Sequence, residues 1–513
     1  MKKSLKIVFI FIMAIFVLRV CLSNNPKKAN NIIVKSSNKS SVVVNITPSV
    51  SNPVKINRTV FGINIGYALA DELDKDSGFV QLLRDLKPAA LRFPGGTVGN
   101  WYHPNLPVYG FKKEELSGIG GNALYNLQSK RSENILYNFI RLCKATNSGA
   151  VYCANFYNGN MQEVTFVIDE LKKNNIPLFG IELGNEYCLM GYRKQFPDAT
   201  TYIQKIKQAA IDLRNKYPGL RIAVVGGDPD NMYDKNTRSR YMLKWNQDLA
   251  SQTFFDAYVW HTYNGNAASD NSAFFDSVYI KNNAYLSPTK NNYIGEAKKQ
   301  FQSVFDSNKK VWITEWNVGN SAMLENTFVQ GAYVSDFFLS VLDINAKSNN
   351  YIELTNLHAL ASIISPANGK IKAFRSIGKY KTTYQYYAFQ FLANTLSLNS
   401  YRCGETITSD AKDVLKQFTC YTFLNKDDNK VYLHFVNHSD RSITLNVNAN
   451  PKSAGDYIAI EADFPYAVAG KAPFENEKAY ANKLVSAKLV NRVLTNKSVQ
   501  IAPYSFGYIS YSY

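Results

Sequence analysis

The chain has 513 residues, more than one ordinary domain needs, so we expect a barrel-sized domain plus a smaller partner. Its net charge of +18 favours contact with polyanions, but its Lys and Arg residues are scattered and form no recognisable nucleic-acid module. Six cysteines are too few for a disulfide framework, and five histidines lack metal-ligand spacing. We therefore expect no metal, no cofactor and no nucleic-acid partner.

Residues 1 to 22 predict an export signal. Lysines precede an uninterrupted apolar run from 7 to 18, which has the length of a signal-peptide core and is short for a membrane span. Arg19 interrupts the expected cleavage site, and Cys21 lacks the small residues that precede a lipid-modified cysteine. An uncleaved membrane anchor is therefore the alternative to a cleaved signal. Either outcome predicts a secreted or cell-surface protein.

Two further features would matter only outside the cytoplasm. Cys403 and Cys420 flank a predicted β-hairpin and could pair in an oxidising compartment, a point that the sequence leaves open. Five Asn-x-Ser/Thr sequons near the two termini are candidate glycan acceptors, at Asn38, Asn45, Asn57, Asn437 and Asn496.

Residues 23 to 56 predict a polar leader followed by one strand, from 41 to 46, which we expect at the edge of a β-domain. From Phe61 onward, short apolar runs alternate with segments of helical periodicity, the pattern of βα units. The predicted strands are Phe61–Tyr67, Ala90–Pro94, Ala150–Phe156, Leu178–Gly184, Arg221–Gly226, Ala257–Tyr263, Lys310–Trp316 and Tyr351–His358. The predicted helices among them are 78–86, 134–145, 163–174, 199–216, 241–250, 296–307 and 327–343.

Eight such units predict an α/β fold, a (β/α)8 TIM barrel spanning residues 57 to 385. A doubly wound open sheet is the alternative, but no Gly-rich dinucleotide fingerprint follows any of the strands. After a helical stretch from 382 to 396, alternation of apolar and polar residues predicts a C-terminal antiparallel β-sandwich, assigned to residues 386 to 513.

Two glutamates stand at strand ends: Glu186 in Gly-Ile-Glu-Leu-Gly-Asn-Glu-Tyr and Glu315 in Val-Trp-Ile-Thr-Glu-Trp-Asn. Catalytic side chains of a parallel barrel gather at the carboxyl ends of the strands. By strand count, Glu186 ends strand four and Glu315 ends strand seven, so the two should face each other across the barrel mouth. A pair of carboxyl groups in that arrangement is what glycosidic bond hydrolysis requires.

The segments Gly184-Asn185-Glu186 and Ile313-Thr314-Glu315-Trp316 resemble the acid/base and nucleophile motifs of the large clan of retaining barrel glycosidases. Residues 90 to 100 are similar to the corresponding segment of the α-L-arabinofuranosidase and heparanase/β-glucuronidase branches. The resemblance covers residues 57 to 385, and the trailing β-domain also matches. It implies that Glu186 acts as general acid and then base, and that Glu315 is the nucleophile.

Three neighbouring positions are predicted to support this pair. Asn185 is suited to hydrogen-bond the sugar hydroxyl next to the reacting carbon, with helix or loop capping as the alternative. Arg92 should reach the mouth from strand two and hold Glu315 ionised, unless it makes only a stabilising salt bridge. His261 and Tyr263 end strand six, and one of them should hydrogen-bond Glu315 or the sugar, with core packing as the alternative.

Three more residues are candidate substrate contacts. Asn155 ends predicted strand three, and His358 closes strand eight, where many relatives place a tryptophan. Trp316 could stack on a sugar ring, although a large aromatic beside a barrel strand more often packs against its helices.

These patterns predict a secreted retaining glycosidase that cleaves O-glycosidic bonds of an extracellular or cell-wall polysaccharide. The sugar could be an arabinofuranoside or an acidic glycan such as a glucuronide, and the basic charge slightly favours the latter. A Ser-His-Asp hydrolase fits poorly because no Gly-x-Ser-x-Gly elbow is present. The alternative outside the enzymes is a carbohydrate-binding or adhesion protein on a decayed glycosidase scaffold, against which the retention of Glu186, Glu315 and Asn185 argues.

Overall fold

The protein is described by a computed structural model. The model describes residues 41–66, 73–116, 133–228, 237–264, 287–290, 292–306, 308–318, 326–366, 374–449, 455–462, 487–494 and 498–512. The predicted export signal and the sequons at Asn38 and Asn496 lie outside these residues. Among the described helices, none is long and apolar enough to cross a membrane.

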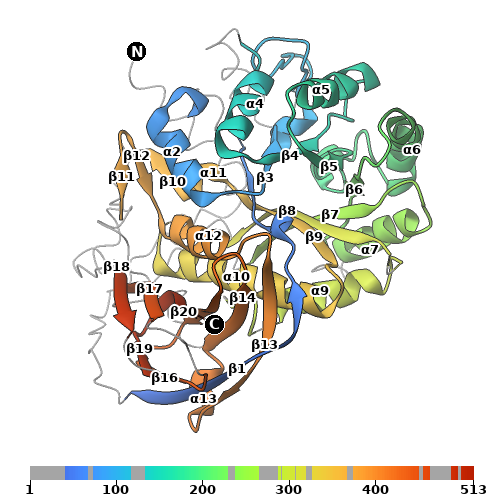
Figure 1. Ribbon diagram of the computed structural model, residues 1–513. Coiled ribbons are helices and arrows are strands. Elements are labelled where there is room, and N and C mark those ends of the chain that lie inside the picture. The colour runs from blue at the N-terminus through green and yellow to red at the C-terminus, as the bar shows by residue number, and fades with distance from the viewer. Residues whose placement is uncertain are drawn as a thin grey trace, which may run out of the picture.

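A closed barrel of eight parallel strands forms one half of the molecule (Figure 1). Its strands are β2 (Gly62–Asn64), β3 (Ala90–Phe93), β4 (Gly149–Cys153), β5 (Leu178–Glu182), β6 (Ile222–Val225), β7 (Ala257–Asn264), β8 (Lys310–Val318) and β9 (Ile352–His358). The helices that follow them are α2 (Ser77–Leu86), α4 (Ile135–Thr146), α5 (Met161–Lys173), α6 (Ala199–Lys216), α7 (Thr237–Ala250), α9 (Tyr293–Gln302), α10 (Phe328–Lys347) and α12 (Tyr384–Thr395). Because β9 pairs with β2, the barrel is closed and the open-sheet alternative is excluded.

Local sequence explains where these elements begin and how the barrel is filled. Helix α5 starts with a capping box: the Asn160 side chain accepts from the Glu163 backbone N–H, and the Glu163 carboxylate accepts from the Asn160 backbone N–H. The Trp312 ring packs against Gly180 inside the barrel, where a Cβ on Gly180 would lie 2.3 Å from it, so only glycine fits. Trp312, Val151, Val259 and other apolar residues fill the inside of the barrel. The polar side chains described below lie at the carboxyl ends of the strands.

The second half is a nine-stranded sheet in the order β18-β17-β20-β15-β14-β13-β1-β16-β19. Its strands are β1 (Val42–Lys55), β13 (Ser400–Thr408), β14 (Phe418–Asn425), β15 (Lys430–Asn437), β16 (Ile443–Val447), β17 (Gly455–Ala462), β18 (Ala487–Leu494), β19 (Ser498–Ile501) and β20 (Ser505–Ser512). Side chains from both ends of this sheet meet in one apolar cluster. The predicted C-terminal β-domain is confirmed, with its strands hydrogen-bonded into one continuous sheet.

Strand β1 joins this sheet, but the predicted edge position is wrong. It lies between β13, to which it is antiparallel, and β16, to which it is parallel. Val42, Val44 and Ile46 point into the apolar cluster, and pairing with a strand on each side places β1 in the interior of the sheet.

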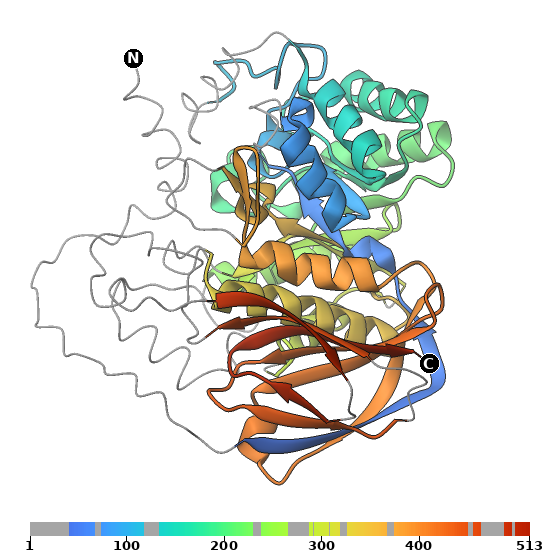
Figure 2. The ribbon, with the colours of Figure 1, turned by 60° about the vertical axis from the view of Figure 1, so that its left-hand side comes forward.

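Helices α10 and α12 lie side by side between the barrel and the sheet (Figure 2). Residues of α10 are buried along nearly its whole length. On α10, Asp336 is fully buried and accepts hydrogen bonds from Ser287 and Thr289, while Nε2 of His438 lies 3.3 Å away. The interface between the barrel and the sheet therefore contains a buried polar group, Asp336, with its hydrogen-bond partners. The remaining elements are short: α11 (Leu360–Ile363), α13 (Lys412–Leu415) and a small sheet of β10 (Ile364–Pro366), β11 (Ser376–Ile377) and β12 (Tyr380–Thr382).

Two candidate glycan acceptors are engaged inside the protein. Asn437 is fully buried, and its Nδ2 donates to the carbonyl oxygens of Arg441 and Ala502 over 3.0 and 2.8 Å. Nδ2 of Asn57 donates to the carbonyl of Glu353 over 2.7 Å. A fully buried Asn437 does not carry a glycan in the folded protein, whereas glycosylation at the partly buried Asn57 stays a prediction.

The two cysteines of the predicted hairpin are both free and buried. Arg402 pairs with Phe423 in the β13–β14 register, so Cys420 lies beyond the residue that would face Cys403. The register thus explains why the two thiols are not joined, and burial raises the pKa of Cys403 to about 11.

Candidate active site

Glu315 is held in the barrel mouth from both sides. It lies on β8, and its side chain is only 7% exposed. Arg92 on β3 donates from Nη1 to its Oε1 over 2.8 Å, and the Tyr263 hydroxyl on β7 donates to its Oε2 over 2.7 Å. Both oxygens therefore have fixed partners, which orients the carboxylate within the mouth as the sequence predicts.

Glu186 reaches the same mouth from the loop after β5 rather than from the strand itself. The strand ends at Glu182, and the chain then turns through Gly184, whose φ is +113°. Glu186 itself has a φ of +55°, in the left-handed region that few non-glycine residues adopt. Its side chain is 27% exposed, so it is the more accessible of the two carboxyl groups.

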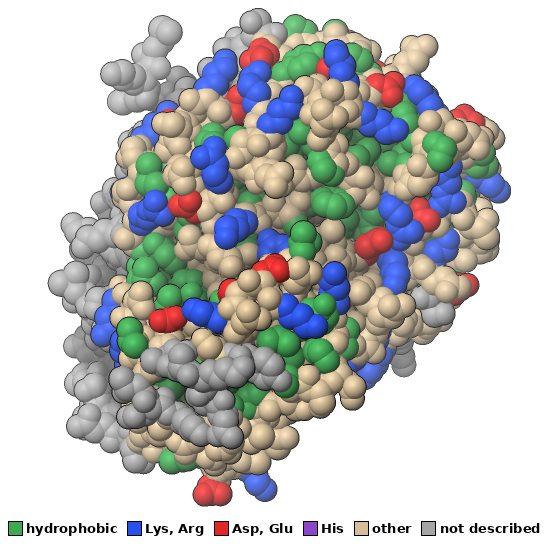
Figure 3. Space-filling model, viewed as in Figure 1, with side chains coloured by type: hydrophobic (Ala, Val, Ile, Leu, Met, Phe, Trp, Pro, Cys, Tyr) green, Lys and Arg blue, Asp and Glu red, His purple; other side chains and the backbone are tan. Residues whose placement is uncertain are grey.

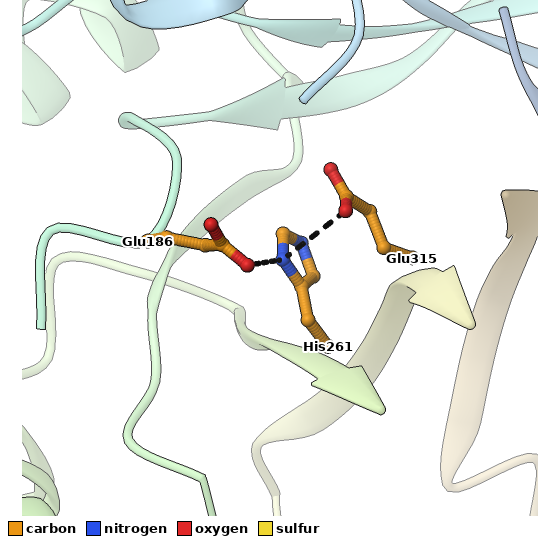
Figure 4. Close-up of side chains that lie close together, drawn as sticks. All are labelled: Glu186, His261 and Glu315. Atoms are coloured by element: carbon orange, nitrogen blue, oxygen red, sulfur yellow. Dashed lines mark hydrogen bonds and ion pairs between the residues drawn. The ribbon is translucent and has the colours of Figure 1, made fainter. Parts of the chain in front are cut away.

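The two carboxyl groups face each other with His261 between them (Figure 4). Nδ1 of His261 lies 3.0 Å from Glu186 Oε1 and 3.8 Å from Glu315 Oε2. These three atoms all lie within 4.8 Å of one another, a spacing that would also suit a metal ion. On the other side of the ring, Nε2 lies 3.1 Å from Thr314 Oγ1, which fixes the orientation of the imidazole.

The surroundings of Glu315 keep it ionised. Burial by itself would raise the pKa of Glu315, but the charges of His261, His358 and Arg92 and the hydrogen bond from Tyr263 lower it well below its ordinary value. Burial also raises the pKa of Tyr263 well above its ordinary value, with the Glu315 charge as the next cause, so the phenol stays a donor. Glu315 thus has the charge that a nucleophile needs.

The two histidines shift in opposite directions. Burial would lower the pKa of His261, but the charge of Glu315 and the hydrogen bond with Glu186 raise it overall. For His358, burial lowers the pKa and the neighbouring Glu315 only partly opposes it. His358 Nε2 lies 4.0 Å from Glu315 Oε2, and its side chain is 34% exposed, so it borders the Glu315 carboxylate and is partly open to solvent. This is the position expected of a substrate contact.

Arg92 also binds Glu182, which the sequence analysis did not single out. Nε and Nη2 of Arg92 donate to the two oxygens of Glu182 over 2.8 and 2.7 Å, and Nη2 also donates to Asn185 Oδ1 over 2.9 Å. Glu182 is the one acid within predicted strand four, and a buried Arg92 requires such partners, so this signal was present in the sequence.

Asn185 and two further asparagines complete the mouth. The backbone N–H and C=O of Asn185 both bond the side chain of Asn100, over 3.0 and 2.9 Å. The Nδ2 of Asn185 is buried without a partner among the described residues, which leaves a donor for a ligand. Asn64 Nδ2 lies 3.5 Å from Glu315 Oε1. Asn64 carries no sequence signal, because it reaches Glu315 only through the barrel closure, whereas Asn100 ends the segment from 90 to 100 that resembles the glycosidase branches.

Two predicted substrate contacts have partners within the protein. Trp316 follows inward-facing Glu315, so it points outward, stacks on Phe337 of α10 at 3.8 Å between ring centroids, and is fully buried. Asn155 uses its Oδ1 to accept from the backbone N–H groups of Tyr157 and Asn158, and it shapes the loop after β4. The assignment of Trp316 to substrate is corrected, because it packs the helix layer. Asn155 caps a turn after β4, and its assignment to substrate stays a prediction.

No protein-family model and no curated protein sequence matches the chain. Solved structures do match it across almost its whole length. The fold is that of the barrel glycoside hydrolases. A family 51 arabinofuranosidase from Xanthomonas axonopodis pv. citri is 12% identical, with 92% of this chain and 100% of that chain aligned at a TM-score of 0.62.

Two further structures show the same fold. A family 51 α-L-arabinofuranosidase from Bifidobacterium longum is 12% identical, with 92% of this chain and 100% of that chain covered and a TM-score of 0.62. A 4-O-α-L-rhamnosyl-β-D-glucuronidase from Fusarium oxysporum 12S is 12% identical over 92% of this chain and 100% of that chain, with a TM-score of 0.54. The predicted TIM barrel with a trailing β-domain is thereby confirmed.

Proposed function

We propose that the protein is a retaining glycoside hydrolase. The observation that carries this proposal is the approach of one Glu186 oxygen and one Glu315 oxygen to within 4.8 Å across the barrel mouth. Retaining glycosidases hold their two carboxyl groups roughly 5 to 5.5 Å apart, whereas inverting enzymes need roughly 6.5 to 9.5 Å to admit a water molecule. The short separation supports double displacement through a covalent intermediate.

In the first step, a Glu315 carboxylate oxygen attacks the anomeric carbon. The bond from that carbon to the leaving oxygen breaks, and Glu186 gives its proton to that oxygen. Glu315 becomes a neutral ester. In the second step, water attacks the same carbon, its proton passes to Glu186, and Glu315 leaves as a carboxylate. The hydrogen bonds from Arg92 and Tyr263 favour Glu315 as nucleophile, and the greater exposure of Glu186 suits proton exchange with solvent.

His261 supports the proton transfers of both steps. Its Nδ1 bonds Glu186 Oε1, and its ring is held on the far side by Thr314. A proton released to Glu186 can therefore be shared with the imidazole, and the shared proton keeps Glu186 directed towards the leaving oxygen. The asymmetric contacts at 3.0 and 3.8 Å associate His261 with Glu186 more than with Glu315.

We infer a neutral glycoside as the first substrate candidate. Around the two carboxyl groups, the described cations are Arg92, paired with Glu182 and Glu315, and His261, paired with Glu186. Burial lowers the pKa of His358 and favours its neutral form, so no unpaired cation is left among the described residues for a sugar carboxylate. On the face shown in Figure 3, Lys and Arg side chains are dispersed and not gathered into one patch. An α-L-arabinofuranoside, as hydrolysed by the arabinofuranosidases with this fold, is therefore favoured over a glucuronide. The predicted export places the polysaccharide outside the cell.

A panel of 4-nitrophenyl glycosides, including α-L-arabinofuranoside and β-D-glucuronide, tests the proposal. We expect wild-type protein to release nitrophenol from one of them and Glu186→Ala and Glu315→Ala to be severely impaired. Glu296→Ala on α9, whose side chain is 55% exposed, is the matched control and should retain wild-type turnover. Product configuration, followed by proton NMR, should be retained. Wild-type protein that binds glycan but turns over no glycoside would instead support the adhesion function.

A further inference from the structure

The buried core of the site holds one cation between two carboxylates. Arg92, Glu182 and Glu315 have side chains that are 0%, 0% and 7% exposed. Four hydrogen bonds leave the guanidinium: two to Glu182, one to Glu315 and one to Asn185. The group as a whole therefore carries one net negative charge in the resting protein.

That charge changes during the proposed reaction, on which this inference rests. When Glu315 becomes an ester, its negative charge disappears while Arg92 stays buried. A buried cation without a counter-ion is strongly destabilising. We propose that Glu182 is the permanent counter-ion of Arg92, which keeps the guanidinium neutralised while Glu315 carries the sugar.

The geometry distinguishes this role from simple packing. Both oxygens of Glu182 accept from Arg92 in a fork-to-fork arrangement, and no other described side chain donates to them. Arg92 is held from the Glu182 side by two bonds and from the Glu315 side by one, so loss of the Glu315 charge leaves its position set. The net negative charge also favours the positively charged sugar of the transition state.

Arg92 further links Glu182 to the residue before the acid. Its Nη2 donates both to Glu182 Oε2 and to Asn185 Oδ1. Glu182 is thus a positioning residue, since it touches neither Glu186 nor Glu315 among the recorded contacts and acts on them through Arg92. The charged and titratable groups around Arg92 and Glu315 are Cys153, Glu182, Glu186, His261, Tyr263 and His358.

A double-mutant cycle in the unfolding equilibrium tests the counter-ion role without any need for activity. Glu315→Gln imitates the discharged nucleophile, and Glu182→Gln removes the proposed counter-ion. Each single variant leaves Arg92 one carboxylate and should fold. The double variant leaves Arg92 buried without a carboxylate partner. The equilibrium constant for unfolding of the double variant should therefore exceed the value expected from additive single effects by at least about tenfold. Adding Arg92→Met to the double variant should restore stability.

The outcomes against the proposal are distinct. Additive single effects would overturn it. A triple variant no more stable than the double would show that packing, not charge, is responsible. Glu353→Gln is the matched control, because Glu353 is a barrel-strand glutamate that binds Arg221 over 2.8 Å at the opposite end of the barrel.

The second arm uses the aryl glycoside that the wild-type protein hydrolyses. Glu182→Gln should lower kcat/KM at least about tenfold and slow formation of the glycosyl-enzyme, followed as the nitrophenol burst, while Glu182→Asp, which keeps the charge, should recover part of the loss. An unchanged burst rate in Glu182→Gln would overturn the role in the reaction. If the wild-type protein proved inert, the proposed function would fail while the unfolding cycle still tested the counter-ion.

Discussion

The phenol of Tyr263 donates a 2.7 Å hydrogen bond to Glu315 Oε2, while the other oxygen is bound by Arg92. The two donors come from β7 and β3, so they hold the carboxylate from different parts of the barrel wall. Each donor is kept protonated, since the pKa of Tyr263 and the pKa of Arg92 both lie well above their ordinary values, against the effect of burial in the case of Arg92. The Glu315 carboxylate is therefore oriented by the protein alone.

Removing the Tyr263 hydroxyl should weaken catalysis without unfolding the protein. A hydrogen bond to a charged group contributes about 1.5 to 3 kcal/mol, which corresponds to a loss of about 10- to 100-fold in kcat/KM for Tyr263→Phe. Tyr258→Phe is the matched control, because its hydroxyl bonds Tyr351 and not the carboxylates. Equal losses of kcat/KM in the two variants, measured with the same aryl glycoside, would show that the loss in Tyr263→Phe does not come from its hydrogen bond to Glu315.

The two glutamates should differ in their response to the leaving group. Glu186→Ala removes the proton donor, so hydrolysis of an alkyl glycoside should fall by about 10²- to 10⁴-fold, while a 2,4-dinitrophenyl glycoside, whose leaving group needs no proton, should suffer much less. Glu315→Ala should impair both substrates alike. If Glu186→Ala lowered the hydrolysis rates of the two glycosides by the same factor, Glu186 would not be the general acid.

The opposite pKa shifts of the two histidines predict opposite pH dependences of stability. His261 has a raised pKa in the folded protein, so its stabilising contribution is complete below about 6.5, its unfolded value, and is lost as the pH rises through the folded pKa. His358 has a lowered pKa, so its contribution is present above about 6.5 and is lost as the pH falls through the folded pKa.

Denaturant unfolding between pH 5 and about pH 9 measures both histidine effects. The free energy of unfolding of the wild type, relative to that of His261→Gln, should decline towards alkaline pH. Relative to His358→Gln, it should decline towards acid pH. If the difference in free energy of unfolding between wild type and variant changed with pH in the same direction for both variants, the assigned pKa shifts would be contradicted.

Trp316 should matter for stability and not for substrate. Its indole stacks on Phe337 and donates to Thr355 Oγ1 over 3.1 Å, all within the buried layer between β8 and α10. Trp316→Ala should cost about 3 to 5 kcal/mol of unfolding free energy, as large buried aromatics do. KM of the folded variant should stay near the wild-type value. A markedly raised KM with unchanged stability would return Trp316 to the sugar site.

The sequence by itself determined the order of the elements and the two acids. Eight apolar runs separated by amphipathic segments admit few arrangements besides a barrel, because buried parallel strands need helices on their outer face. Glu186 and Glu315 are recognisable because a carboxylate that closes an apolar run is hard to explain by packing. His261, Tyr263 and Arg92 follow from the same reasoning at other strands, and all three contact one or both acids.

Only the tertiary structure decided what each neighbouring side chain touches. Closure of the barrel brings Asn64 to Glu315 across a wide sequence separation that no local pattern records. Strand alternation turns Trp316 outward because Glu315 faces inward, and the sheet register places β1 between two strands. Local sequence sets the periodicity of each element, whereas the residues that a side chain contacts depend on how elements distant in sequence pack together.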